Sequence, residues 1–375
     1  MASTAVAAFL AERAPEAAPT DGDLAQPHPA PPVHIPSWKA FEDGFTAASR
    51  TSGEGAEAAD GTTVSFNLWA AVYGWFANGG GACYIVPVPS TGEAGTSVYA
   101  GDRDGGTAWG LAALEAVDKV TIVVAPDLWT VSSGGPEQAR DKARLGAAAI
   151  AGHCERMGNR VAVLHQAAGA SPADAGWDFT LEPDVKPYTT VYYPWVQVRG
   201  LDKDPVSVPP VGHVAGVWAR VDANRGVHKA PANEGLRGVI ALEHSLTGAE
   251  QGELNDNGVN CLRSGQGILV WGARTLAASD TSEVESSYLN VRRSVNFIKQ
   301  SIRQSTNWAV FEPNDDALQT SVGAMVTSFL RDLWRRGMLV GKSPEEAFYV
   351  VCDETNNPPE NAAQSKLICD VGVAL

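Results

Sequence analysis

The chain has 375 residues, with 43 acidic and 28 basic side chains, so its net charge is −15 at pH 7. This charge opposes non-specific binding to nucleic acid or anionic lipid, and we therefore expect proteins as partners and no nucleic acid. The length predicts two or three domains, because single hydrophobic cores stop growing near ~250–300 residues. No run of ~18 apolar residues is present, so direct membrane insertion is not expected.

The first 89 residues are predicted to hold a strand, a surface segment and a helix followed by a strand. Residues 4–9 have the character of a short strand, and the seven prolines between Pro15 and Pro36 break any regular element after it. An aromatic-rich helix is expected over 64–76, ending at the glycines of 78–81. An apolar strand over 83–88 follows it.

An α/β layer architecture is predicted for the part of the chain before about residue 280. The runs at 120–125 and 160–164, like that at 83–88, are mostly apolar, which is typical of parallel strands covered on both faces. A helix over 135–157 lies between two of them, giving a β-α-β alternation. Further strands are expected over 188–198, 238–242 and 267–271, and a further helix over 211–222.

Residues 280–375 are predicted to form an α+β domain. Apolar residues from Val291 to Ile302 recur at helical spacing, and a second apolar stripe runs from Leu318 to Leu333. Two strands, over 348–352 and 367–373, follow with a polar segment between them.

The five cysteines are widely spaced and odd in number: Cys83, Cys154, Cys261, Cys352 and Cys369. Most of them stand among apolar residues. This pattern favours reduced thiols in a cytosolic environment over a disulfide framework or a zinc site.

Motifs for nucleotide and metal chemistry are absent from the sequence. No Gly-x-Gly-x-x-Gly follows a strand, no His-Glu-x-x-His is present, and the glycines at 337 and 341 are one residue too close for a phosphate loop. We therefore expect no cofactor and no metal site. The acid-rich segments 250–256 and 280–285 lack the calcium-loop pattern and are interpreted as solvated turns or contact patches.

One motif points toward hydrolysis. The segment around His213 is similar to part of subtilisin-type proteases, in which the nucleophilic serine stands five residues before this histidine. Here that position is Val208, which has no hydroxyl, so we expect no enzyme activity. An α/β hydrolase, active or degenerate, stays the alternative; its candidate residues are Ser97 or Ser171 with His165 or His213.

Basic side chains are concentrated on the two predicted C-terminal helices. Such residues often form a solvated helix face, or favourable charges at a helix end. In a chain of this net charge they are also candidates for contacts that orient one subunit against another. The candidate subunit contacts are Arg292, Arg293, Lys299, Arg303, Arg331, Arg335 and Arg336.

Eight ordered blocks carry a resemblance to a known family. They are NGGGACY at 78–84, GVWARVD at 216–222, GVHKAPANE at 226–234, LNDNGVN at 254–260, VWGARTL at 270–276, YLNVRR at 288–293, WAVFEPN at 308–314 and PEEAF at 344–348. Together they resemble the contractile tail sheath proteins of phages and related injection systems, over most of the chain.

This resemblance implies a fold and a function. The implied fold is α/β, a subtilisin-like parallel-sheet domain without protease activity over 90–279, then a sheath C-terminal α+β domain over 280–375. Such subunits stack as hexameric rings in a helical sleeve around an inner tube, between a baseplate and a cap. Contraction of the sleeve drives the tube into a target. Assembly in the cytoplasm is implied, within a virion or a released phage-like particle.

The resemblance also suggests where neighbouring molecules bind. A polar segment before the last strand contacts the tube in relatives; the matching residues here are Asn361, Gln364 and Lys366. In relatives, extended terminal arms add strands to a neighbour's sheet. This sequence begins at Met1 and ends at Leu375 without matching arms, which implies a shortened chain or a different linkage. An oligomeric binding scaffold unrelated to contraction is a third hypothesis.

Overall fold

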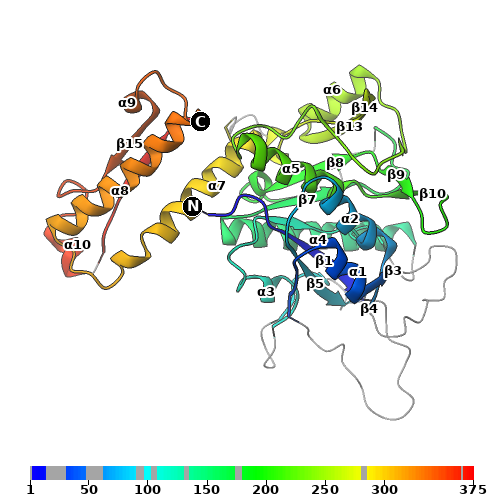
Figure 1. The fold of residues 1–375 in the computed structure, drawn as a ribbon, viewed down its shortest axis with the longest axis horizontal. Coiled ribbons are helices and arrows are strands. Elements are labelled where there is room, and N and C mark those ends of the chain that lie inside the picture. Colours follow the sequence, from blue (N-terminus) through cyan, green and yellow to red (C-terminus); the bar gives the residue numbers. More distant parts are fainter. Residues whose placement is uncertain are drawn as a thin grey trace, which may run out of the picture. The chain divides into compact units, whose positions relative to one another are not determined.

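The computed structural model describes residues 2–13, 31–47, 62–89, 97–102, 108–130, 135–173, 180–279, 285–364 and 366–375. It contains two compact units, a larger one of Ser3–Arg293 and a smaller one of Ser294–Leu375 together with Ala2. Figure 1 follows the chain from the N-terminal strand in blue to the last strand in red. No helix in the described ranges is long and apolar enough to cross a membrane.

Parallel strands form the centre of the large unit's main sheet. In spatial order they are β8 (Thr189–Tyr193), β7 (Val161–His165), β6 (Ile122–Val124), β1 (Ala7–Arg13) and β5 (Cys83–Pro89). All residues of β6, β7 and β8 are buried. Burial on both faces explains the apolar sequences of β6 and of β7 up to Leu164, whereas β8 begins with two buried threonines. The prediction of a mixed α/β fold with a parallel-rich sheet is confirmed.

Two hydrophobic clusters pack against the two faces of this sheet. Phe9 of β1 belongs to the cluster formed with α2 (Phe66–Ala77) and α5 (Val211–Arg225). Leu10, the next residue, belongs to the cluster formed with α3 (Gly110–Leu114) and α4 (Pro136–Met157). Because consecutive side chains of a strand point to opposite faces, the central strand β1 contributes to both clusters.

Further strands extend the sheet at both sides. On one side are β13 (Val259–Gly265), β14 (Gly267–Trp271) and β11 (Glu234–Gly235); on the other are β2 (Val33–Ile35), β3 (Phe45–Ala47) and β4 (Thr62–Val64), with α1 (Trp38–Gly44) between β2 and β3. The presence of β2 corrects the prediction that no regular element forms before residue 37. Residues 14–30 of the proline-rich segment lie outside the described part of the chain.

A separate three-stranded sheet contains β10 (Pro205–Val208), β9 (Val196–Arg199) and β12 (Ala241–Leu242). The single strand predicted over 188–198 was therefore wrong, since β8 ends at Tyr193 and β9 begins at Val196 in another sheet. Pro194 lies between them and has no backbone N–H for the ladder. The helix α6 (Gly248–Asp256) precedes β13 and starts with a capping box formed by Thr247 and Glu250.

Helices α2 and α5 approach each other through glycines. A Cβ atom added to Gly212 would lie 2.1 Å from the carbonyl oxygen of Ala71, and one added to Gly216 would lie 2.5 Å from that of Trp75. The predicted small-residue helix at 211–222 is thus a close-packing surface. The glycine run after α2 begins at Gly79, whose φ of 109° is a backbone conformation that favours glycine.

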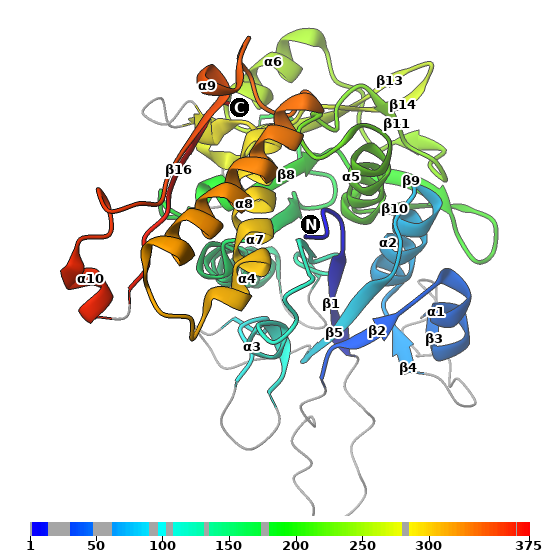
Figure 2. The same cartoon turned by 60° about the vertical axis from the view of Figure 1, so that its left-hand side comes forward.

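The small unit consists of helices and a two-stranded sheet. Helix α7 (Leu289–Ser305), which begins in the large unit, lies beside α8 (Asp316–Arg335), with ring centroids of Phe297 and Phe329 6.4 Å apart. Figure 2 shows these helices with strand β16 running along α8. The remaining elements are α9 (Pro344–Ala347), β15 (Phe348–Val351), α10 (Pro359–Ala363) and β16 (Asp370–Val373). The predicted apolar stripe of α8 is buried, from Leu318 to Leu333.

Candidate functional site

Five of the predicted contact residues lie on the small unit. Lys299 and Arg303 are exposed on α7, and Arg331 and Arg335 are exposed near the end of α8. Arg336 forms an ion pair of 2.8 Å with Asp332, but both side chains are about half exposed. Exposed pairs of this kind contribute only about 0–1 kcal/mol to stability. These cations therefore do little for the fold of the unit and can face another molecule.

Arg293, one of the predicted subunit contacts, is buried in the interior of the large unit. Its guanidinium forms two hydrogen bonds with Asp222, of 2.9 Å from Nη1 and 2.5 Å from Nη2, and both side chains are buried. Nη2 also donates to the carbonyl of Thr4 at 3.0 Å, and the group lies over the ring of Trp218. The planar guanidinium binds both oxygens of the Asp222 carboxylate and also the carbonyl of Thr4. Arg293 thus joins the chain before β1 to α5.

Arg292 is also engaged within the large unit, although less completely. Its guanidinium lies 4.5 Å from the ring centre of Tyr188 and donates a hydrogen bond of 3.2 Å to the hydroxyl of that residue. The side chain is half-buried. A cation held over an aromatic ring contributes about 0.5–1 kcal/mol at such a site. Arg292 is therefore a weaker contact candidate than the four exposed cations.

The predicted tube-contact residues lie in and after α10. Gln364 and Lys366 are exposed and joined by a 2.8 Å hydrogen bond from Nζ to Oε1. Asn361 is half-buried, because its side-chain amide donates to the carbonyl of Asn356. Pro359 is the first residue of α10, a position where proline favours a helix because its missing N–H needs no partner.

An apolar tip connects α7 and α8, and its exposure was not predicted from the sequence. We define the tip as Trp308, Val310 and Phe311; the first two are half-exposed and Phe311 is fully exposed. Phe311 has a φ of 83°, which is unfavourable for a bulky side chain. Exposed apolar groups held in this way are typical of contact surfaces. The signal available in the sequence was three apolar residues in the turn between two amphipathic helices.

Asn314 holds this tip close to the predicted tube-contact segment. Its amide nitrogen donates to the carbonyl of Lys366 at 2.6 Å, and its amide oxygen accepts from Gln319 of α8 at 3.1 Å. Figures 1 and 2 both show α10 beside the turn that joins α7 to α8. The apolar tip and the polar residues after α10 therefore lie at one end of the small unit.

The two-stranded sheet of the small unit has open edges. Within the described residues, β15 and β16 pair only with each other. Two strands alone are marginally stable in water, and an unpaired edge presents backbone donors and acceptors to another chain. On the outer face, Tyr349 is 60% exposed and covers Gly372, since a Cβ on that glycine would lie 2.0 Å from the tyrosine ring.

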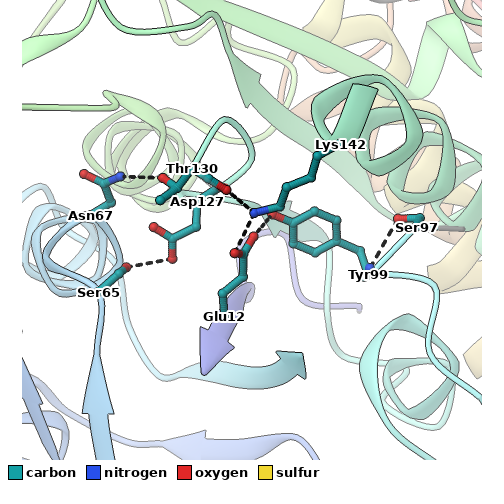
Figure 3. A network of polar contacts seen from close by, with 8 residues as sticks. All are labelled: Glu12, Ser65, Asn67, Ser97, Tyr99, Asp127, Thr130 and Lys142. Carbon is teal, nitrogen blue, oxygen red and sulfur yellow. Dashed lines mark hydrogen bonds and ion pairs between the residues drawn. The ribbon is translucent and has the colours of Figure 1, made fainter. Parts of the chain in front are cut away.

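A buried polar network lies in the large unit, at the carboxyl ends of β1 and β6 (Figure 3). Lys142 of α4 places its Nζ 2.6 Å from one carboxylate oxygen of Glu12, and the hydroxyl of Tyr99 donates to the other. Burial raises the pKa of Glu12 to about 7, with Lys142 opposing the shift and Asp127 adding to it. After β1 and after β6 the chain continues to opposite sides of the sheet. Open α/β sheets bind ligands in the crevice between two such strands.

Internal contacts occupy this position of the sheet. Lys142 also donates to the carbonyl of Thr130, and the hydroxyl of Ser65 donates to Asp127 at 2.7 Å. Ser65 is at the same time the N-cap of α2, accepting from the backbone of Leu68. The network thus ties β1, α2, α4 and the turn after β6 together, and its groups are used for the fold.

In the described part of the chain, neither histidine of the hydrolase alternative is hydrogen-bonded to a serine. His213 is fully buried on α5, and neither ring nitrogen has a hydrogen-bond partner among the described residues. Burial lowers its pKa to about 4. Ser97 accepts a hydrogen bond from the backbone of Tyr99, and His165 packs against Trp195 with Nδ1 2.9 Å from the carbonyl of Gln166. The position five residues before His213 is the buried Val208.

Comparison with known proteins identifies the family. Residues 140–276 match the phage tail sheath protein central domain, and residues 283–375 match the phage tail sheath C-terminal domain. The chain belongs to the phage tail sheath family. This membership confirms the resemblance predicted from the sequence blocks, and it places the chain among structural proteins.

Relatives of this tail sheath family member come from several phages. The tail sheath protein of Vibrio phage KVP40 is 30% identical over 171 residues, covering 44% of this chain and 24% of the relative. That of Burkholderia phage BcepMu is 30% identical over 185 residues, covering 47% of this chain and 37% of the relative. The chain therefore matches well under half of the length of these curated relatives.

Solved structures align with the whole chain. The helical sheath of the anti-feeding prophage in its contracted state is 26% identical, with a TM-score of 0.70, and the match covers 100% of this chain and 90% of that one. The sheath complex of an extracellular contractile injection system, also contracted, is 25% identical with a TM-score of 0.67, covering 100% and 88%.

Proposed function

We propose that this protein is a contractile sheath subunit. In this proposal it polymerises as stacked hexameric rings around an inner tube, and contraction of the sleeve drives the tube into a target. The observation that carries the proposal is the match along the whole chain to sheath subunits of contracted assemblies. A fold of the large unit derived from a subtilisin-like α/β domain, and the division into residues 1–89, 90–279 and 280–375, are parts of the same proposal.

Subunits would be linked through β15 and β16. A strand from a neighbouring subunit would pair with an open edge of this sheet and complete its ladder. Such links let subunits move apart or closer without separating, which contraction requires. The energy would come from the free-energy difference between two packings of the same subunits, so that no cofactor or nucleotide is consumed.

The remaining contacts follow from the surfaces of the small unit. Gln364, Lys366 and Asn361 would face the inner tube. Lys299, Arg303, Arg331, Arg335 and Arg336, with a smaller part for Arg292, would orient neighbouring sheath subunits. Further partners would be the baseplate and cap proteins. The particle would assemble in the cytoplasm and act as a virion or as a released phage-like particle.

The test is negative-stain electron microscopy of the protein expressed with the tube and baseplate proteins of its own particle. Hollow six-fold sleeves around tubes are expected. Dispersed subunits beside assembled bare tubes would refute the sheath proposal.

Proline substitutions test the strand linkage separately. The N–H of Ala374 donates to the carbonyl of Ala347, and hydrogen bonding alternates along an antiparallel ladder. Tyr349 and Gly372 therefore bond within the sheet, whereas the N–H groups of Val350 and Val371 point outward. Val350→Pro and Val371→Pro each remove one outward donor, whereas Tyr349→Pro removes a donor within the ladder. At least one outward variant should keep its melting temperature but lose sleeves. Normal sleeves from both would contradict linkage through these edges.

A further inference from the structure

Two cysteines stand opposite each other where the β15–β16 ladder ends. The last registered pair is Val351 with Asp370, so the next pair along the two antiparallel strands is Cys352 with Cys369. The N–H of Ala374 donates to the carbonyl of Ala347, which gives this pair the orientation of a hydrogen-bonded pair. Alternation along the ladder then makes the cysteines a non-hydrogen-bonded pair. In such pairs the Cα atoms are about 4.5 Å apart, within the range of about 4.4–6.8 Å found in disulfides.

Both thiols lie on the α8 side of the sheet and interact with each other. Cys352 is buried and Cys369 half-buried. A Cβ atom on Gly323 of α8 would lie 3.4 Å from that of Cys352, so the helix backs this position closely. Burial raises the pKa of Cys369 to about 12, and the neighbouring Cys352 thiol adds to the shift. The two sulfur atoms are thus neighbours inside the small unit.

The other three cysteines have different surroundings. Cys83 is on β5, Cys154 on α4 and Cys261 on β13, and all three are buried in the large unit. Burial raises the pKa of each of these thiols to about 12. They provide matched controls of the same chemical type within the same chain.

We propose that Cys352 and Cys369 form a disulfide under oxidising conditions. A small-molecule disulfide, such as oxidised glutathione, is the oxidant. The thiolate of one cysteine attacks a sulfur of this oxidant and releases one molecule of reduced thiol. The thiolate of the second cysteine then attacks the mixed disulfide and releases the other. Two cysteine thiols are oxidised, one small disulfide is reduced, and the two protons end on the released thiols.

The bond would close the segment between the two strands at its base. This segment contains the turn at Asn356 and Asn357, where the Asn357 side chain bonds to both backbone groups of Ile368. It also contains α10 and the proposed tube-contact residues. If the proposed sheath function holds, the thiols would be reduced during assembly in the cell and joined in a particle outside it.

The test is peptide mapping by mass spectrometry without reduction. The purified full chain is incubated with oxidised glutathione and then digested. The expected main product is a pair of peptides joined through Cys352 and Cys369, whose mass is lower by two hydrogen atoms than the sum of the two reduced peptides. Cys352→Ala and Cys369→Ser should each abolish it, and Cys154→Ser should leave it unchanged. Formation should be faster at higher pH, because only the thiolate attacks.

Two outcomes would overturn the disulfide. One is a glutathione adduct on Cys369 that persists without the internal bond; the other is a Cys369 dimer between chains. Neither outcome depends on sleeve formation, which is imaged on the reduced chain. An internal bond in a protein that forms no sleeves would refute the sheath function alone, and sleeves from a chain that forms no bond would refute the disulfide alone.

Discussion

Replacing Arg293 by methionine should destabilise the large unit strongly. Arg293→Met keeps the length of the side chain but leaves the carboxylate of Asp222, whose side chain is 1% exposed, without its countercharge. Removing one partner of a buried ion pair costs about 3–5 kcal/mol, and the lost hydrogen bond to Thr4 is part of that change. Such a loss lowers the ratio of folded to unfolded protein roughly 100- to 1,000-fold or more.

A double variant separates charge from packing. Arg293→Met combined with Asp222→Leu leaves no unpaired charge, so much of the lost stability should return. Burial raises the pKa of Asp222, and Arg293 opposes that rise, so the pKa should increase further when Arg293 is removed. The single variant should therefore lose less stability at about pH 5 than at about pH 7, because the carboxyl group takes up a proton more easily at the lower pH.

Urea unfolding followed by tryptophan fluorescence measures these changes. Lys299→Met is the matched control, because Lys299 is an exposed cation on the same helix and its loss should change stability by about 0.5 kcal/mol or less. Two results would contradict a stabilising buried pair: a stability of Arg293→Met within about 1 kcal/mol of the natural protein, or a double variant no more stable than the single one.

Three further predictions concern other positions. The folded-state pKa of Glu12, about 7, lies above its ordinary value of 4.5. The protonated side chain therefore stabilises the fold below about pH 4.5, and roughly 3 kcal/mol of stability is lost as the pH rises through 7. Glu12→Gln should remove this part of the pH dependence in urea unfolding, and an unchanged pH profile in the variant would contradict the prediction. Gly212→Ala should lower the stability by at least about 2 kcal/mol in the same assay, because the new Cβ atom would meet the Ala71 carbonyl. Gly152→Ala is the control and should leave the stability unchanged or raise it, because its Cβ atom would meet only the end of the Arg156 side chain at 3.5 Å. Phe311→Gly should stabilise the free subunit by about 1 kcal/mol, because glycine adopts the positive φ of this position without strain. The same variant should form fewer sleeves in electron micrographs, and normal sleeves would show that the tip makes no contact.

The centre of the fold could be predicted from sequence because burial leaves a periodic signal. Strands β6 and β7, covered on both faces, read as uninterrupted apolar runs, and the long helix α4 lies between them. Strand β2 could not be predicted in this way. It has three residues and is stabilised by pairing with β5, far away in sequence, so its own composition carries little information.

The contact surfaces were predictable only in part, because charge in a sequence does not reveal exposure. Arg293 and Arg335 look alike in sequence, but Arg293 meets Asp222, which lies 71 residues away along the chain. The opposition of Cys352 and Cys369 likewise depends on strand register, and a shift of one residue would remove it. Such long-range pairings are set by the fold, and local patterns do not contain them.

Two ion pairs inside the large unit differ from a group of cations on the small unit in their exposure to solvent. In the large unit, Arg293 with Asp222 and Lys142 with Glu12 are buried pairs that join elements distant in sequence. In the small unit, Lys299, Arg303, Arg331 and Arg335 are exposed. The same unit also has the apolar tip and a sheet with open edges. Buried pairs are weakly screened by salt, and exposed charges are strongly screened. The buried pairs of the large unit should therefore keep their strength as the salt concentration rises, whereas a contact made through the exposed cations of the small unit should weaken.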